Sequence, residues 1–259
     1  MLQEERLQRL RSILSSLRQI KTNRIATDLG VSRETVRRDV LELEALGELR
    51  RVHGGVIATG PEPEPPIDER LNVRLREKRR IAGVAAKLPS PGDTLFLDGG
   101  STTVLALAEE IASLSGLTII TNSFDVALKL AAADGKGQPR HHVIMLGGQL
   151  GSGIAATYGE STVAEIYRHF TDWAFLSPVG IHPKYGATSY AHNEAAVARA
   201  MAQRAKRTVI LADHSKIGQV SRIGFCLMEE IDTLIVDKKA STHPVFADLK
   251  AVSNNVLLA

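Results

Sequence analysis

A loop rich in glycine and hydroxyl side chains lies between an apolar run at 94–97 and a helical pattern at 103–113. Glycine lets a backbone approach a ligand closely, and hydroxyls together with the free N–H groups of a helix start suit a phosphate. The loop has neither the Gly-Lys-Ser/Thr of a P-loop nor the Rossmann glycine spacing. A glycine turn in which Ser101 only caps the helix explains the same residues. The candidate phosphate ligands are Asp98, Gly99, Gly100, Ser101, Thr102 and Thr103.

Polar residues and glycines also follow the other apolar runs of this part of the chain. Lys216 closely follows Asp213, and an ammonium group near the hydroxyl-rich loop would complement a phosphate. Structural alternatives exist: Asn122 can cap the next helix, paired glycines can form a turn, and Lys216 can be a solvated charge. The further candidate effector ligands are Thr121, Asn122, Ser123, Gly147, Gly148, Gly180, Asp213 and Lys216.

These candidates all follow expected strands of an α/β arrangement. Apolar β-rich runs predict strands at 94–97, 118–120, 142–146, 173–176, 208–211 and 233–236. Helical patterns separate them, at 72–86, 103–113, 123–133, 161–168 and 192–205. This alternation predicts a mainly parallel sheet covered on both faces, which binds ligands beyond the carboxyl ends of its strands.

A second group of candidate functional side chains consists of the arginines near the N-terminus. Helical patterns run over 4–17, 23–29 and 33–46, with Thr22 and Ser32 as expected N-caps. Gly30 and Gly47 are suited to end the second and third helices. Residues 49–56 can form a two-stranded wing. The sequence therefore predicts a winged helix-turn-helix, whose third helix enters the major groove of DNA.

The DNA-contact residues follow from this placement. Arginine can bond a guanine edge with two hydrogen bonds, and hydroxyls bond phosphates or bases. Arg33, Glu34 and Arg37 are the candidates for base edges. A helical dimerisation module with a solvated arginine face is the alternative. The whole set of DNA-binding candidates is Thr22, Ser32, Arg33, Glu34, Thr35, Arg37, Arg38, Arg50, Arg51 and His53.

Charge and proline content divide the 259-residue chain in two. Residues 1–60 hold 11 Lys+Arg and 8 Asp+Glu, whereas residues 61–259 hold 21 of each, so the net charge of +3 lies in the first part. Four prolines within residues 61–66 indicate a stiff polyproline linker. We therefore expect a DNA-binding domain at 1–60, a linker at 61–66 and an effector-sensing domain at 67–259.

Composition excludes several other classes of protein. A single cysteine, Cys226, rules out an internal disulfide framework, and it and Trp173 are expected in the core. No apolar run is long enough to span a membrane and the N-terminus lacks a signal core, so we expect a cytoplasmic protein that joins the nucleoid when bound to DNA. No metal or other cofactor is expected, because the histidines lack ligand spacing; they include His141, His142, His182, His192 and His214.

Both halves of the chain resemble one family, the DeoR family of bacterial transcription regulators. In the first half the resemblance lies in residues 31–40, in Leu43, Gly47 and Leu49, and in residues 51–55. In the second half it lies in residues 98–103, 121–123, 146–148, 172, 174–176, 180–181 and 212–216. The chain departs at Val40 and Val56, where members usually carry Leu and Ala, and at Ser177-Pro178 ahead of Gly180.

The resemblance implies a fold and a function. It implies a C-terminal effector domain similar in fold to ribose-5-phosphate isomerase, which senses a small phosphorylated sugar or sugar acid. It also implies repression of sugar catabolism genes, with homo-oligomers (dimers or tetramers) bound to double-stranded operator DNA and altered there by the effector. The alternative is an isomerase-like enzyme acting on a sugar phosphate, with Asp98, Glu194 or Asp213 as its base.

Overall fold

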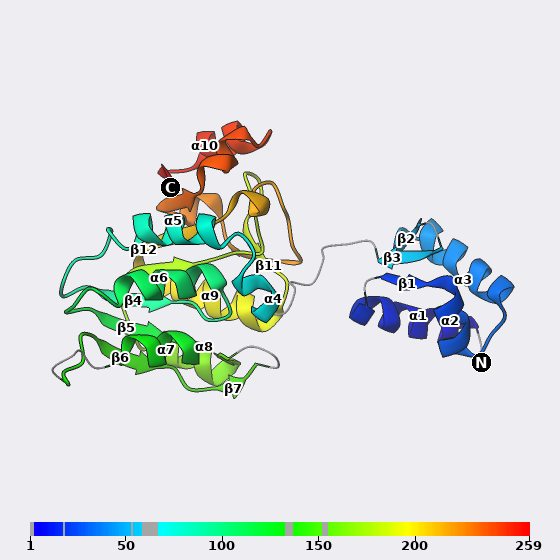
Figure 1. The fold of residues 1–259 in the computed structure, drawn as a ribbon, viewed down its shortest axis with the longest axis horizontal. Helices are drawn as coiled ribbons and strands as arrows, with labels where there is room; N and C mark the ends of the chain where they lie inside the picture. The colour runs from blue at the N-terminus through cyan, green and yellow to red at the C-terminus, as the bar shows by residue number, and fades with distance from the viewer. Residues whose placement is uncertain (1–2, 18, 53, 59–66, 133–136, 152–154) are drawn as a thin grey trace. The chain divides into compact units, whose positions relative to one another are not determined.

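The computed structural model describes the chain except for residues 1–2, 18, 53, 59–66, 133–136 and 152–154 (Figure 1). The chain forms two compact units, Met1–Glu62 and Pro63–Ala259. The predicted linker at 61–66 lies outside the described residues. No helix among the described residues is long and apolar enough to cross a membrane.

The N-terminal unit packs three helices against a small antiparallel sheet. Leu7, Leu10 and Leu14 recur at helical spacing on the first helix and are buried with Ile25 of the second and Val36 of the third. The strand order is β1-β3-β2. The elements are α1 (Gln3–Leu17), β1 (Gln19–Lys21), α2 (Thr22–Leu29), α3 (Arg33–Ala45), β2 (Leu49–Val52) and β3 (Gly55–Ala58).

The ends of these helices test the expected caps. Ser32 is the N-cap of α3, as predicted, and its Oγ accepts a hydrogen bond from Thr35 N at 3.1 Å. Gly30 ends α2 in the left-handed conformation at φ +65°. The cap predicted at Thr22 is wrong, because Thr22 is already the first helical residue and Lys21 precedes the helix without a side-chain cap. Lys21 also ends β1, so the strand leaves no room for a separate cap.

The C-terminal unit is built on a seven-stranded sheet with the order β15-β14-β12-β9-β4-β5-β6. Every pairing in this sheet is parallel, as the alternation of strands and helices predicted. Its strands are β4 (Thr94–Leu97), β5 (Thr118–Thr121), β6 (His142–Met145), β9 (Thr171–Leu176), β12 (Ala205–Ala212), β14 (Thr233–Val236) and β15 (Val256–Leu258).

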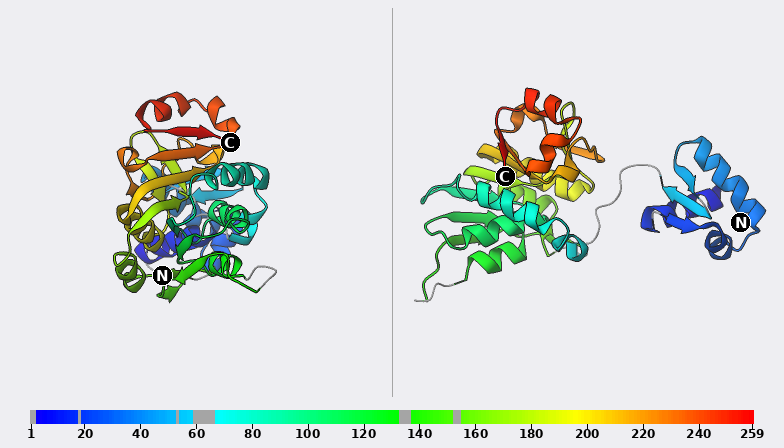
Figure 2. Two further views of the ribbon diagram at one scale, coloured as in Figure 1. Left: turned by 90° about the vertical axis from the view of Figure 1, so that its left-hand side faces the viewer. Right: turned by 45° about the horizontal axis from the view of Figure 1, so that its top comes forward.

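Helices cover both faces of this sheet, as Figure 2 shows. Alternate residues of β4 separate the two cores: Leu95 and Leu97 pack with the helices α5 (Leu75–Ala85), α6 (Thr102–Ile111) and α7 (Phe124–Leu130). Phe96 points to the other face, which α8 (Glu160–Ile166) and α9 (His192–Arg204) cover. Because all strands run the same way, their carboxyl ends meet at one edge.

Several elements were not expected from the sequence. The helix predicted at 72–86 is found as α5, but it begins only at Leu75, after Arg74 with φ +53°; the short helix α4 (Ile67–Leu71) ahead of it was not predicted. A second, antiparallel sheet joins β10 (Gly180–His182), β11 (Gly186–Ser189) and β13 (Ile223–Cys226). The remaining additions are β1 and β15, given above, β7 (Gln149–Leu150), β8 (Thr157–Tyr158), α10 (Phe246–Val252) and short 3-10 helices η1 (His214–Lys216), η2 (Met228–Glu230) and η3 (Lys238–Thr242).

Candidate functional site

The N-terminal unit contains a hollow of about 320 Å³ between the start of α3 and the β2–β3 wing. Recognition-helix and wing residues that are far apart in the sequence meet here, as a major-groove reader requires. Apolar and glycine residues line part of it. The predicted DNA-contact residues that line it are Thr22, Arg33, Glu34, Arg37 and Arg51.

The other predicted DNA-contact residues lie outside this hollow. The hydroxyls of Ser32 and Thr35 are 2.8 Å apart at the start of α3, so they stabilise the helix end. Arg38 is exposed and its Nε lies 3.9 Å from the carboxylate of Glu34 one turn earlier. Arg50 is exposed on β2, and His53 lies outside the described residues. Their contacts with DNA stay predictions.

Arg51 is held by an acidic residue of the recognition helix. Its backbone N–H donates to Glu44 Oε1 at 3.0 Å and its Nε donates to Glu44 Oε2 at 2.6 Å. The backbone hydrogen bond, followed by the guanidinium, lowers the pKa of Glu44. This ion pair joins the wing to α3 and fixes the direction of the Arg51 side chain.

A second ion pair anchors the recognition helix from the side of α1, and the sequence analysis did not single it out. Asp39 is buried on α3 and accepts hydrogen bonds from Arg6 Nε at 2.8 Å and Arg6 Nη2 at 2.9 Å. Such a two-pronged pair sets the orientation of one helix against the other. An acidic residue at an otherwise apolar helical position was the available signal.

The C-terminal unit contains a cavity of about 300 Å³ at the carboxyl ends of β4, β9 and β12. This is the edge at which the parallel sheet predicted a ligand site. Eight of the predicted effector residues line the cavity: Asp98, Gly99, Gly100, Ser101, Thr102, Thr103, Asp213 and Lys216. The lining residues that were not predicted as effector ligands are Glu69, Arg70, Val73, Arg74, Lys78, Ser177, Val179, Ser189, Glu194, Ala198, Ser215 and Phe225.

The glycine and hydroxyl loop lies between β4 and α6 and forms one wall of this cavity. Ser101 Oγ caps α6 by accepting from Thr103 N and Val104 N, both at 3.2 Å. The loop therefore has the capping role that was weighed as an alternative, and it also faces the cavity. Because Thr102 and Thr103 form the first turn of α6, the positive end of that ten-residue helix opens to the cavity.

Four basic residues line the cavity beside this loop: Arg70, Arg74, Lys78 and Lys216. Arg70 Nη2 donates to Gly100 O at 3.1 Å, and Lys78 Nζ donates to Arg70 O at 2.7 Å. Lys78 is only 5% exposed. Burial lowers the pKa of Lys78, the Asp213 carboxylate opposes that shift, and the charges of Arg70, Lys216 and Arg74 add to it. The sequence showed a basic segment at 67–80 but not that three of its residues would meet Lys216.

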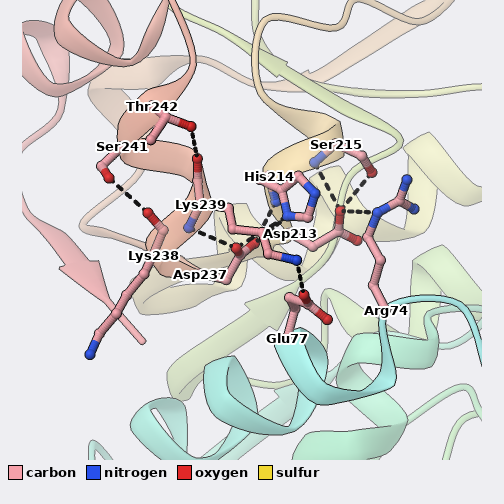
Figure 3. A network of polar contacts seen from close by, with 10 residues as sticks. All are labelled: Arg74, Glu77, Asp213, His214, Ser215, Asp237, Lys238, Lys239, Ser241 and Thr242. Carbon is pink, nitrogen blue, oxygen red and sulfur yellow. Dashed lines mark hydrogen bonds and ion pairs between the residues drawn. The ribbon is translucent and has the colours of Figure 1, made fainter.

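A polar network orders the far side of these cations (Figure 3). Asp213 is buried, and its Oδ1 accepts hydrogen bonds from Ser215 N at 2.9 Å and from Ser215 Oγ at 2.6 Å. The same oxygen lies 3.6 Å from Arg74 Nε. Next to it, His214 Nδ1 is 3.1 Å from both carboxylate oxygens of the buried Asp237. This network ties the β12–η1 turn to Arg74, which precedes α5.

The same network also fastens α5 to η3 (Figure 3). Lys239 Nζ donates to Glu77 Oε1 at 2.7 Å, and this hydrogen bond is the main cause that lowers the pKa of Glu77. Lys239 N in turn donates to Asp237 Oδ1 at 3.0 Å. The segment that carries Arg74 and Lys78 is therefore joined to the turns after β12 and β14.

The other wall of the cavity has a different character. Ser189 at the end of β11 donates from Oγ to Glu194 Oε2 at 3.1 Å. Val179, Ala198 and Phe225 add apolar surface beside this pair. The cavity thus has a basic wall next to the α6 start and a wall of hydroxyl, carboxylate and apolar groups on α9 and the small sheet.

The six remaining predicted effector residues do not line the cavity. Thr121 Oγ1 donates to Leu97 O at 2.7 Å. Ser123 caps α7, so Asn122 does not have the capping role that was weighed as the alternative to ligand binding. Gly147 N donates to Glu165 Oε2. Gly148 and Gly180 lie so close to neighbouring atoms that an added Cβ would come within 1.9 Å of Thr162 Oγ1 and 2.5 Å of Gln219 O.

Asn122 instead connects the glycine and hydroxyl loop at 98–103 to the strand β8. The side chain is fully buried: its Oδ1 accepts from Gly99 N at 2.7 Å, and its Nδ2 donates to Thr157 O at 2.9 Å. The two bonds join the end of β5 to the loop after β4 and to β8, a connection that no local sequence pattern predicts. Asn122 therefore supports the cavity wall without facing the cavity.

Among the described residues, no group of three or more His, Cys, Asp and Glu side chains could hold a metal ion. His141 is buried, with Nε2 3.1 Å from Ile111 O, and burial is the main cause that lowers its pKa. Cys226 and Trp173 are both buried, as predicted.

The fold and the two sites define a winged helix-turn-helix transcription regulator with an α/β sensor unit. The pattern described as "DeoR-like helix-turn-helix domain" matches residues 6–61, and that of the "DeoR C terminal sensor domain" matches residues 73–238. The chain belongs to the DeoR family of transcription regulators. This membership does not favour the alternative of an isomerase-like enzyme.

Similar proteins cover almost the whole chain. The HTH-type transcriptional repressor GlcR of Bacillus subtilis is 36% identical over 96% of this chain and 93% of its own length. The lactose phosphotransferase system repressor of Streptococcus mutans is 34% identical over 92% of this chain and 93% of its own. Among solved structures, ribose 5-phosphate isomerase A from Methanocaldococcus jannaschii aligns with 58% of this chain and 55% of its own, at 18% identity and a TM-score of 0.37.

Proposed function

We propose that the protein is a repressor of genes for the catabolism of a sugar or sugar derivative. It binds double-stranded operator DNA through the hollow between α3 and the wing, as a homo-oligomer (a dimer or tetramer). A small phosphorylated effector in the C-terminal cavity changes that binding. The names of relatives support the repressor role, since they include GlcR and a lactose phosphotransferase system repressor. The protein acts in the cytoplasm, on the nucleoid.

The observation that carries this proposal is the basic wall of the cavity beside the start of α6. Buried cations and a helix N-terminus bind phosphate because both interact favourably with its negative charge. Lys78 is nearly fully buried among other cations, which disfavours its charged form. A phosphate dianion would reverse that effect, so the site is better suited to an anion than to an uncharged ligand.

The opposite wall supports a sugar as the rest of the effector. Hydroxyl groups can donate to the carboxylate of Glu194 and bond to the hydroxyl of Ser189, while the C–H surface of a sugar can contact Phe225 and Val179. A carboxylate of a sugar acid at this wall would face the charge of Glu194. The arrangement therefore favours a phosphorylated neutral sugar over a phosphorylated sugar acid.

A thermal-shift screen tests the effector. Matched pairs of phosphorylated and unphosphorylated pentoses and hexoses are compared with inorganic phosphate, because a ligand of the folded state raises its melting temperature. We expect only phosphorylated sugars to stabilise the protein, and Lys216→Ala and Lys78→Met to abolish the shift. Lys250→Ala on the exposed face of α10 is the matched control. Equal shifts for Lys216→Ala and the wild type would show that the phosphate binds elsewhere.

Operator binding is tested with DNA selected from a random pool by the wild-type chain. Arg37→Ala should weaken binding by about 1–3 kcal/mol and relax the preference for one base if Arg37 reads a base edge. Arg9→Ala, at an exposed position of α1, is the control. Unchanged affinity and unchanged base preference for Arg37→Ala would remove Arg37 from this role.

A further inference from the structure

Helix α7 carries apolar side chains on its solvent-facing side as well as on its buried side. Val126, Ala127 and Leu130 pack into the core beneath it, as helical spacing requires. Phe124 and Leu128, one turn apart on the opposite side, are 37% and 74% exposed. A large apolar residue that is three-quarters exposed beside a second one indicates a surface that another molecule covers.

The exposed side of α7 borders a hollow of about 570 Å³. Helices α4, α6 and α7, which surround it, lie on the same side of the main sheet (Figure 1). Leu71 on α4, 37% exposed, adds apolar surface next to Leu128. We call this surface the α7 face; it consists of Ile67, Leu71, Leu105, Phe124, Asp125, Leu128 and Lys129.

The charges on the α7 face are arranged so that the face is complementary to itself. Asp125 and Lys129 are one helical turn apart, on either side of Leu128 in the sequence, and both are exposed. In a two-fold symmetric contact, residue i of one copy meets residue j of the other and residue j meets residue i. Two antiparallel α7 helices would therefore place Asp125 against the partner's Lys129 twice, with Leu128 between the two pairs.

We propose that the α7 face is a self-association surface of this protein and that its occupant is a second copy of the chain, packed with α7 antiparallel across a two-fold axis. Leu128 of each copy then enters the hollow of the other, beside Leu71 and Leu105. A regulator that reads a repeated operator needs at least two copies, and a two-fold axis meets that need. The assignment of the surface does not depend on the identity of the effector.

Sedimentation equilibrium of the full chain over a range of concentrations tests the surface. Leu128→Asp should remove one association step or raise its dissociation constant at least tenfold, because it buries a carboxylate in the apolar hollow. Phe170→Asp is the matched control, since Phe170 is 75% exposed but lies outside the α7 face. Trp173 fluorescence checks that both variants fold. The proposal would be overturned if Leu128→Asp associated as tightly as the wild type. It would also be overturned if the wild-type chain stayed monomeric at concentrations on the order of 100 μM.

A charge-reversal pair tests the antiparallel arrangement itself and keeps every change at exposed positions. Asp125→Lys should weaken association severalfold, because like charges then meet across the axis. The double variant Asp125→Lys with Lys129→Asp should recover most of the loss. Lys129 Nζ also lies 3.4 Å from Glu109 Oε1, so Glu109→Gln alone, which leaves the proposed pair intact, serves as the reference for the loss of that contact. A double variant no better than Asp125→Lys would refute the two-fold pairing.

Discussion

Replacing Asn122 by alanine should destabilise the C-terminal unit far more than loss of a helix cap would. The side chain is fully buried and makes two hydrogen bonds, from Gly99 N at 2.7 Å and to Thr157 O at 2.9 Å. Alanine removes both bonds and leaves a buried N–H and a buried C=O without their partner. Gly99 begins the loop that lines the cavity, so the substitution also loosens that wall.

The expected size follows from these two bonds. Each buried hydrogen bond contributes about 1 kcal/mol net, and a buried backbone group left without a partner costs about 1–3 kcal/mol. We therefore expect a loss of about 3–4 kcal/mol in the free energy of unfolding. In a unit of this size, that corresponds to a fall in melting temperature of roughly 10 °C.

Urea unfolding followed by Trp173 fluorescence measures this loss in the full chain. Every Phe, Tyr and Trp lies after residue 66, so aromatic fluorescence reports the C-terminal unit alone. Two controls distinguish loss of the two buried hydrogen bonds from loss of a helix cap. The first, Ser123→Ala, removes the N-cap of α7 and should lower the free energy of unfolding by about 1 kcal/mol. Asn255→Ala removes a partly buried bond to Thr233 Oγ1 at 3.3 Å and should cost less than that.

The result that would refute the reasoning is a loss for Asn122→Ala no larger than the loss for Ser123→Ala. That outcome would mean that Gly99 N and Thr157 O find other partners, and that the loop is held by its own geometry. An unchanged effector-induced thermal shift in Asn122→Ala would likewise show that this tether does not support the cavity wall.

Four further predictions concern the same unit. Gly186→Ala should destabilise by at least about 2 kcal/mol in urea unfolding, because φ is +68° and an added Cβ would lie 2.1 Å from Cys226 O. Gly83→Ala, inside α5, should stabilise the unit by about 0.5–1 kcal/mol, because an added Cβ would have no atom within 4 Å. If Gly186→Ala and Gly83→Ala both stabilised the protein, the structure would be contradicted. The hydrogen bond from Lys206 lowers the pKa of Asp172, so Asp172 contributes stability above its ordinary value of 3.8 that is lost as pH falls through its folded value. Asp172→Asn should therefore flatten the acid end of the stability–pH curve, and an unaltered slope would oppose this. Burial raises the pKa of the Cys226 thiol to about 12, so a thiol reagent at pH 8 should modify it only after unfolding; rapid labelling of the native chain would contradict its burial.

Local signals were sufficient for much of the fold. The Ser32 cap, the left-handed Gly30 and the strand at Thr94–Leu97 depend on neighbouring residues, and each was found where the sequence predicted it. Short elements were missed for the same reason. The three residues of β1 at Gln19–Lys21 are too few to show a period, and they form a strand only because β3 pairs with them.

The cavity was predictable in position but not in composition. Glycine and hydroxyl residues after parallel strands predicted a ligand site at the carboxyl-end edge of the sheet. One cavity at that edge is lined by residues 98–103, Asp213 and Lys216. Lys78 reaches the cavity because α5 packs on β12 and β14, and Arg70 reaches it because α4 packs on α6; both are contacts between distant segments. The role of Asn122 changed for a similar reason, since its partners lie on other elements.

The sequence by itself determined the two-part organisation of the protein, its family and the types of its main elements, because periodicity, caps and motif spacing are local properties of the chain. Only the tertiary structure decided which charges share a site, which polar groups are buried and which apolar faces stay uncovered. Those properties depend on the packing of segments that are far apart in the sequence, and side-chain burial and electrostatic interactions are set by that packing.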